Sequence, residues 1–129
     1  GATLVTAPAS NAAMIAADGY WGTETTRLLQ ILFKLDVVDG IVSSQPASRA
    51  SANPGLAGGW DWVSDASANG SQTIGALQGM LKVTQDGLIG PGTISALQAR
   101  YKLPQDGVLS AESPTIMKLQ AELNGVTHG

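Results

Sequence analysis

The chain has 129 residues, of which 43% are hydrophobic and 13% are charged, and its formal net charge at pH 7 is −3. The length suits one compact domain, and the apolar fraction is too high for a disordered chain. The small negative charge argues against nucleic acid or an anionic membrane as a partner. Because the chain has no cysteine, disulfides, thiolate metal sites and thiol nucleophiles are excluded.

The sequence offers few side chains for catalysis. Its one histidine, His128, is the second-last residue, so a zinc site or a Ser-His-Asp triad would have to recruit it from a chain end. No matched pair of acid and base carboxylates is evident in the sequence either. We therefore expect a binding or structural module that uses no cofactor and no metal.

Residues 1–17 are rich in Ala and Thr, contain Pro8 and carry few charges. We interpret them as a linker or tail. A signal peptide is a poorer interpretation, because the segment lacks a basic region ahead of its apolar residues.

A short pattern then recurs four times along the chain: Leu-Gln, with an apolar residue three positions after the Gln. Apolar residues at positions i, i+3 and i+7 follow one face of an α-helix. The pattern predicts four amphipathic helices near 23–35, 71–82, 91–102 and 113–123, and we expect an all-α helical bundle. The four copies are Leu29-Gln30, Leu77-Gln78, Leu97-Gln98 and Leu119-Gln120.

An Asp-Gly pair precedes each helix and indicates a tight turn, because Asp bonds to the backbone ahead of it and Gly accepts positive φ. The turns are Asp18-Gly19, Asp39-Gly40, Asp86-Gly87 and Asp106-Gly107. Spacing between turns and helices predicts two turn–helix–turn–helix units in a domain of residues 18–125. They are a long unit, 18–83, and a short unit, 84–125, followed by a tail at 126–129.

The long unit carries an insertion at residues 45–70, whose Gly, Ala, Ser, Asn and Pro content predicts a loop. It contains Trp60-Asp61-Trp62, which offers two aromatic faces and a carboxylate within three residues. Such groups suit a sugar ligand, since glycans present flat C–H faces and hydroxyl edges. The alternative is that one or both tryptophans fill the small core and anchor the loop.

The remaining candidates are also open to two interpretations. An apolar residue three places after each turn Asp, such as Trp21, is expected in the core, whereas Tyr20 is the better candidate for ligand contact. Arg27 and Arg49 suit bidentate contacts with carboxylates or phosphates, although Arg27 is also an ordinary solvent-facing helix charge. The four Gln side chains either bond to a neighbouring turn or face a groove. The four turn Asp residues are scattered, so we assign them to turns rather than to a calcium site.

Two stretches resemble a known family. Asp18-Gly19-Tyr20-Trp21-Gly22, with Thr25 and Gln30 beyond it, is similar to the repeat of peptidoglycan-binding domains, and Asp86 to Gln98 looks like the same motif with its Gly90-Pro91-x-Thr93. The tandem layout resembles the C-terminal cell-wall-binding domains of endolysins from phages of Gram-positive, especially actinobacterial, hosts. The resemblance covers about residues 18–125.

The resemblance implies a non-catalytic module that holds a lytic hydrolase on peptidoglycan or an associated wall glycopolymer. It implies a covalently attached catalytic domain as partner, and action at the bacterial cell wall by a phage enzyme released from the host cytoplasm or by a secreted protein. The ligand-binding candidates are Tyr20, Arg27, Arg49, Trp60, Asp61 and Trp62. The alternative functions are a protein-interaction or dimerisation module and a small cell-wall hydrolase.

Overall fold

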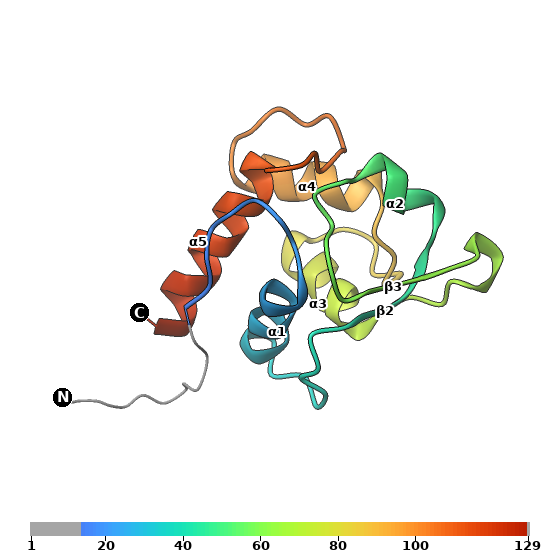
Figure 1. Ribbon diagram of the computed structural model, residues 1–129, viewed down its shortest axis with the longest axis horizontal. Helices are drawn as coiled ribbons and strands as arrows, with labels where there is room; N and C mark the ends of the chain where they lie inside the picture. Colours follow the sequence, from blue (N-terminus) through green and yellow to red (C-terminus); the bar gives the residue numbers. More distant parts are fainter. Residues whose placement is uncertain (1–13, 129) are drawn as a thin grey trace.

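The computed structural model describes residues 14–128. In chain order its elements are α1 (Thr23–Leu32), β2 (Val42–Pro46), α2 (Ser48–Ala52), β3 (Trp60–Val63), η1 (Asp65–Ser67), α3 (Gln72–Leu81), α4 (Pro91–Arg100) and α5 (Pro114–His128). The long helices lie together, while the strands and α2 lie to one side of them (Figure 1). No helix in this range is long and apolar enough to cross a membrane.

The expectation of an all-α fold is wrong, because the protein is mixed α/β. Two strands inside and just before the insertion, β2 and β3, pair in parallel, with Val42 opposite Trp60 and Gln45 opposite Trp62. The register shifts between Val42 and Gln45. There the Ser44 backbone amide donates to Asp61 Oδ2 at 2.9 Å instead of to the ladder. The small residues of the insertion predicted a loop. The structure instead has two short strands there, joined by α2.

The four predicted helices correspond to α1, α3, α4 and α5. Each turns one apolar face inward, and these faces form the core together with Trp21, Val42, Leu56 and Trp60. Three of the helices are followed within two residues by a Lys with positive φ, namely Lys34, Lys82 and Lys102. α5 differs, because it continues to His128 instead of ending near residue 123.

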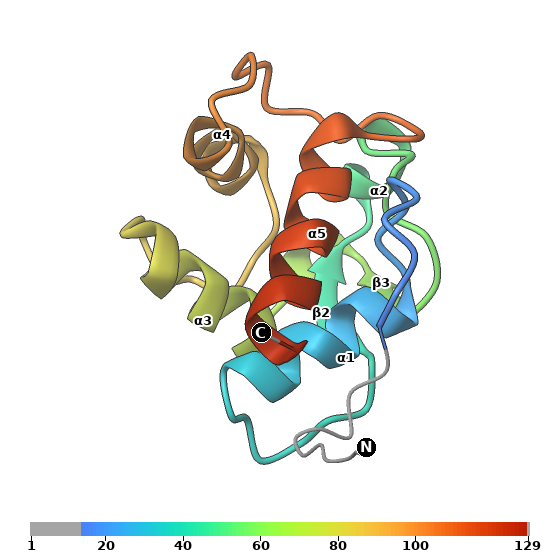
Figure 2. The ribbon, with the colours of Figure 1, turned by 90° about the vertical axis from the view of Figure 1, so that its left-hand side faces the viewer.

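The helices form a closed ring rather than a row. α1 contacts both α5 and α3, and α3 contacts α4. Arg100 and Tyr101, at the end of α4, both bond to Glu122 on α5, which completes the circle. Figure 2 shows α3, α4 and α1 arranged around α5, with the strands behind them. The ring therefore joins the first and last described parts of the chain.

Candidate functional site

A similar hydrogen-bonded arrangement lies between each helix of the ring and the next, and we call it a junction. At each junction the Gln side chain bonds to an Asp-Gly turn, and at three of them it also bonds to a Thr hydroxyl of the next helix. At the Gln78 junction, Gln78 Nε2 on α3 donates to the Asp86 carboxylate at 2.8 Å, to the Leu88 carbonyl at 3.1 Å and to the Thr93 hydroxyl of α4 at 2.9 Å. Gln78 Oε1 accepts from the Gly87 amide at 2.8 Å. One buried amide group thus fixes the turn that follows α3 and the first turn of α4.

The other three Gln residues make matching bonds, so the junction occurs four times. Gln30 bonds to the Asp39-Gly40 turn and to Thr73 of α3. Gln98 bonds to the Asp106-Gly107 turn, ahead of α5. All four Gln side chains are at most 3% exposed. Of the two interpretations of these residues, bonding to a neighbouring turn is confirmed.

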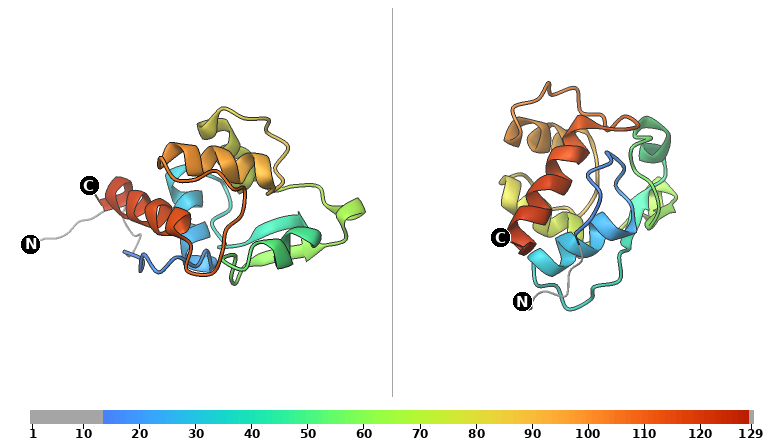
Figure 3. Two further views of the ribbon diagram at one scale, coloured as in Figure 1. Left: turned by 90° about the horizontal axis from the view of Figure 1, so that it is seen from above. Right: turned by 60° about the vertical axis from the view of Figure 1, so that its left-hand side comes forward.

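The Gln120 junction closes the ring across almost the whole described chain. Gln120 Oε1 accepts from the Gly19 amide at 3.0 Å, and Nε2 donates to Asp18, to the Tyr20 carbonyl and to the Thr25 hydroxyl. The side chain of Asn124 exchanges two further bonds with the backbone of Ile15. In the views of Figure 3, the segment before α1 runs beside α5. Ile15 thus contributes to the fold, although residues 1–17 were predicted to be a linker; residues 1–13 lie outside the described range.

Each turn glycine also lies close to the start of the helix before it. Gly87 has φ of +75°, and a Cβ added there would lie 2.9 Å from the backbone of Ser71, just ahead of α3. A residue with a side chain would meet both the strained φ and this contact. The positive φ and the close contact therefore both favour Gly at this position.

The insertion accepts a hydrogen bond from one equivalent backbone amide in each repeat. The amides belong to the residue three places after each turn Asp, and the donor–acceptor distances are 2.7–2.8 Å. The acceptors are all different: the pairs are Trp21 to the Gly55 carbonyl, Val42 to the Gly59 carbonyl, Ile89 to Gln45 Oε1 and Leu109 to Asn53 Oδ1. The insertion therefore makes a hydrogen bond to the equivalent position of all four repeats.

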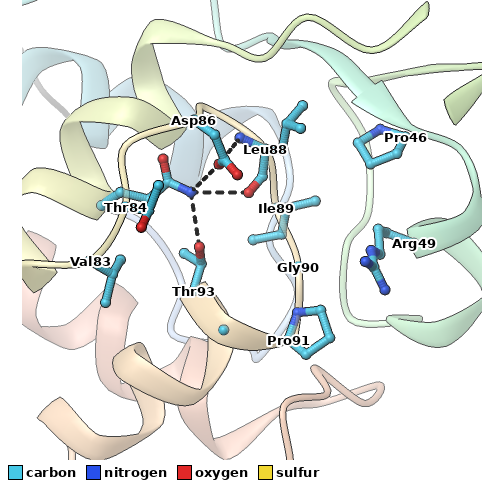
Figure 4. A pocket seen from close by; sticks show the side chains of 12 residues that line it. Pro46, Arg49, Val83, Thr84, Asp86, Leu88, Ile89, Gly90, Pro91 and Thr93 are labelled. Atoms are coloured by element: carbon cyan, nitrogen blue, oxygen red, sulfur yellow. Dashed lines mark hydrogen bonds between the residues drawn. The ribbon is translucent and has the colours of Figure 1, made fainter. Parts of the chain in front are cut away.

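Pockets of the same make-up lie at three of the junctions. Each is lined by the junction Gln, by the turn Asp and by the residue two places after that Asp. The volumes are about 370 Å³ at Gln78, about 440 Å³ at Gln120 and about 270 Å³ at Gln98. Figure 4 shows the pocket at the Gln78 junction. The ring thus presents one kind of surface depression repeatedly.

An apolar side chain is exposed or half-buried at the same position of every junction, two residues after the turn Asp. Tyr20 is 38% exposed, Val108 is 39% exposed and Ile41 is 40% exposed, whereas Leu88 is half-buried. Tyr20, Leu88 and Val108 each line the pocket of their junction. An apolar group beside a carboxylate and an amide can contact both faces and edges of a polar ligand.

The turn carboxylates of three junctions are held in their ionised form. Hydrogen bonds from the Leu88 amide and from Gln78 lower the pKa of Asp86. The pKa of Asp39 is lowered by the Ile41 amide and Gln30, and that of Asp106 by Gln98 and the Val108 amide. A carboxylate with a lowered pKa is a poor general acid at neutral pH, so these groups suit binding better than proton transfer.

The two tryptophans of the insertion have different surroundings. Trp60 is 8% exposed, its Nε1 donates to the Trp21 carbonyl at 3.0 Å, and its ring packs edge-on against the buried Trp21 ring. Trp62 is half-buried, and its ring stacks on Trp60 with centroids 5.4 Å apart. Trp60 and Trp21 therefore belong to the core, as one interpretation predicted. Trp62 remains a ligand-binding candidate, with part of its ring accessible.

The structure does not bring the six predicted site residues together. Asp61 lies next to both tryptophans but is engaged by the Ser44 amide. Arg49 lines the pocket at Gln78, and Tyr20 lines the one at Gln120. Arg27 on α1 lines none of the three pockets, and its Cγ lies close to Gly40. The predicted residues thus mark four separate places on the molecule.

Several functional candidates were missed by the sequence interpretation. Leu88 and Val108 occupy the position of Tyr20, and the alignment of the Asp-Gly turns was the signal that relates them. Gln45 and Asn53, which receive the amides of Ile89 and Leu109, had no such signal, since each occurs once and in a segment of loop-like composition.

A metal-binding cluster is not found among residues 14–128, where no group of three or more His, Asp or Glu side chains comes together. Comparison with family models, with curated proteins and with solved structures finds no match for this chain.

Proposed function

We propose that this protein is a non-catalytic module that binds bacterial peptidoglycan or an associated wall polymer, and so holds an attached lytic hydrolase on the wall. The observation that carries the proposal is the recurrence of one pocket at three junctions of the ring. A polymer with a repeating unit offers several copies of the same group, and a protein with several copies of one pocket can engage them together.

The chemistry of the pockets supports a polar, partly apolar ligand such as a glycopeptide. Each combines an apolar side chain, a turn carboxylate and backbone groups, and the three volumes lie near the lower end of the range for small-ligand sites. Each pocket is therefore suited to a small part of a polymer rather than to a large free ligand. The resemblance of the Asp-Gly repeats to peptidoglycan-binding domains supports the same choice of polymer.

Tethering is the effect expected of such a module. Once it is bound, an attached enzyme works at a high effective concentration at its substrate, without any new contact between enzyme and substrate. Several weak pockets also allow one to release while the others hold. The module therefore suits an enzyme that must stay on an insoluble polymer while it acts.

Sedimentation with purified peptidoglycan from a Gram-positive wall tests the proposal. The protein is expected in the pellet with peptidoglycan and in the supernatant with cellulose, and no soluble sugar or peptide should be released. Replacing Tyr20, Leu88 and Val108 singly with Ala should weaken binding several-fold, and the triple variant should lose nearly all of it.

Val126→Ala is the matched control, because Val126 is 53% exposed on α5 and lies outside the three pockets. Its binding should equal that of the wild type. Circular dichroism of the same samples shows whether the variants stay folded, and light scattering shows whether they keep the same assembly state. A wild-type protein that remains in the supernatant with every Gram-positive wall tried would overturn the proposal.

A further inference from the structure

The pocket at the Gln78 junction differs from the other two in charge. All three are lined by the turn carboxylate, and the pocket at Gln120 has Glu24 in addition. Only the pocket at Gln78, among these three, is also lined by a cation, the guanidinium of Arg49. The same depression thus carries one sign of charge at two junctions and both signs at the third.

Arg49 is placed over the pocket by the insertion. It lies on α2, directly after β2, and a methyl group added to Gly90 would be 3.7 Å from its Nε and 3.8 Å from its Nη2. Within the described range, its guanidinium forms no hydrogen bond and no ion pair; the ion pair found there joins Arg100 to Glu122. The donors of Arg49 are therefore available to a ligand.

Asp65 is an anion near Arg49 that is not part of the pocket. Its pKa is lowered chiefly by hydrogen bonds from Ser48, and the charge of Arg49 is the weakest of the causes. The Ser48 amide donates to Asp65 Oδ1 at 3.1 Å, which holds this carboxylate at the start of α2. In the described structure no hydrogen bond or ion pair joins Asp65 to the guanidinium of Arg49, so its donors are not engaged by Asp65.

Asp86 lines the same pocket as Arg49. In Figure 4, Arg49 and Pro46 are on one side of the segment that contains Ile89 and Gly90, and Asp86 is on the other side with Val83 and Thr84. Both bonds that the Asp86 side chain accepts reach Oδ1, from Gln78 and from the Leu88 amide. Neither of these two bonds reaches Oδ2, so that oxygen can receive a donor from a ligand.

We propose that this pocket binds a short zwitterionic peptide, with its free carboxylate on Arg49 and its free amino group on Asp86. Both contacts are charge-assisted, and Arg offers a planar pair of donors to a carboxylate. The volume of about 370 Å³ suits a small group, and Pro46, Leu88 and Ile89 give it apolar walls. The proposal rests on the proposed wall-binding function, since it names a peptide branch that keeps a free carboxylate and a free amino group as the part of the polymer bound at this junction.

Nuclear magnetic resonance titration with three small probes tests this assignment. The probes are D-alanyl-D-alanine, its N-acetyl form and its C-terminal amide, which carry both charges, only the carboxylate and only the amino group. We expect the free dipeptide to shift the backbone amides of Leu88, Gly90 and Gly92 with a Kd on the order of 1–10 mM. Each capped form should bind at least fivefold more weakly.

Arg49→Gln should remove the difference between the free dipeptide and its amide, and it touches no hydrogen bond of the fold. Lys118→Gln is the charge-matched control, because Lys118 is exposed and lies outside the three pockets, and it should behave as the wild type. Equal shifts from all three probes, no shifts at all, or an unchanged preference in Arg49→Gln would overturn the zwitterion assignment, whether or not the protein sediments with peptidoglycan. Charge-dependent shifts without any sedimentation would instead support the pocket and overturn the wall-binding proposal.

Discussion

The ring of junctions and the insertion both form hydrogen bonds to equivalent backbone amides of the repeats, but they do so in different ways. At the junctions, one residue type in one position makes the same bonds around the ring, from Gln30 to Gln120. The insertion meets four equivalent backbone amides with four different acceptors, two of them carbonyls and two of them side chains. Repetition thus stabilises the ring, whereas the insertion is fitted to each repeat separately.

This difference separates two kinds of substitution. A change in a junction Gln alters one of four similar connections, and the others remain. A change in the insertion alters a contact that has no equivalent elsewhere in the described structure. A substitution in the insertion therefore has no equivalent contact to compensate for it, although the insertion has the composition of a loop. The predictions below test this comparison in order of expected effect.

Trp60→Ala should have the largest effect. It removes a ring that packs on Trp21 and Trp62 and leaves a cavity in the insertion, so we expect a loss of about 3–5 kcal/mol in the free energy of unfolding. Urea denaturation followed by circular dichroism measures it. Trp62→Ala, two residues away and half-buried, is the matched control and should cost less than half as much; equal losses would contradict a core role specific to Trp60.

Gln120→Ala tests the closure of the ring. Removal of the amide leaves the buried Gly19 amide and Thr25 hydroxyl without their partner, and we expect a loss of about 2–4 kcal/mol. Gln98→Ala is the comparison, because its partners lie only 8 to 10 residues away along the chain and stay close to it. Hydrogen exchange should show loss of protection around Gly19 only in Gln120→Ala. A greater loss of stability in Gln98→Ala would contradict this account of closure.

Gln45→Ala tests the tie between the insertion and the ring. Gln45 is fully buried, accepts from the Ile89 amide at 2.7 Å and donates to the Gly87 carbonyl at 2.9 Å. We expect a loss of about 2 kcal/mol, since both backbone groups would remain buried without a partner. The control is Gln72→Ala, an exposed residue at the start of α3, which should change the unfolding midpoint little. Similar midpoints for the two variants would show that the tie is not needed.

The loss of stability on acidification should be the smallest of the predicted effects, because each turn carboxylate contributes only a little. The pKa values of Asp39, Asp86 and Asp106 are lowered in the folded state from an ordinary value of 3.8. Their contribution to stability is therefore present above pH 3.8 and is lost as the pH falls through the folded-state values. Urea midpoints between pH 6 and pH 3 should decline toward acid, and less steeply in Asp106→Asn. A midpoint that rises on acidification would be the opposite of this expectation.

The sequence predicted the helices and turns of the ring better than the insertion, and the reason is physical. The Leu-Gln and Asp-Gly patterns recur because each junction needs the same buried amide and the same turn, so the helices and the burial of Trp21 follow from them. The closing junction joins residues about 100 positions apart, and only the fold shows that the first turn takes the place of a fifth one.

The parallel strands were missed for a different reason. β2 is rich in polar residues and does not alternate, and β3 alternates over Trp60-Asp61-Trp62 but is only four residues long. The two strands also pair with a shifted register, so neither gives a clear strand pattern. Gln45 and Asn53, which accept from the Ile89 and Leu109 amides, are single polar residues in a segment of small residues. The pockets were also out of reach, because each is built from a turn and two helices whose relative positions are set by the ring.

The central proposal is that equivalent junction pockets bind a repeating wall polymer. The most direct measurement is an amide chemical-shift map of the ¹⁵N-labelled protein with soluble peptidoglycan fragments that contain several repeating units. The account predicts that shifts gather at Tyr20, Leu88 and Val108 together, with smaller changes at Val126. Shifts confined to the strand with Trp62, or no shifts with fragments of any Gram-positive wall, would contradict it.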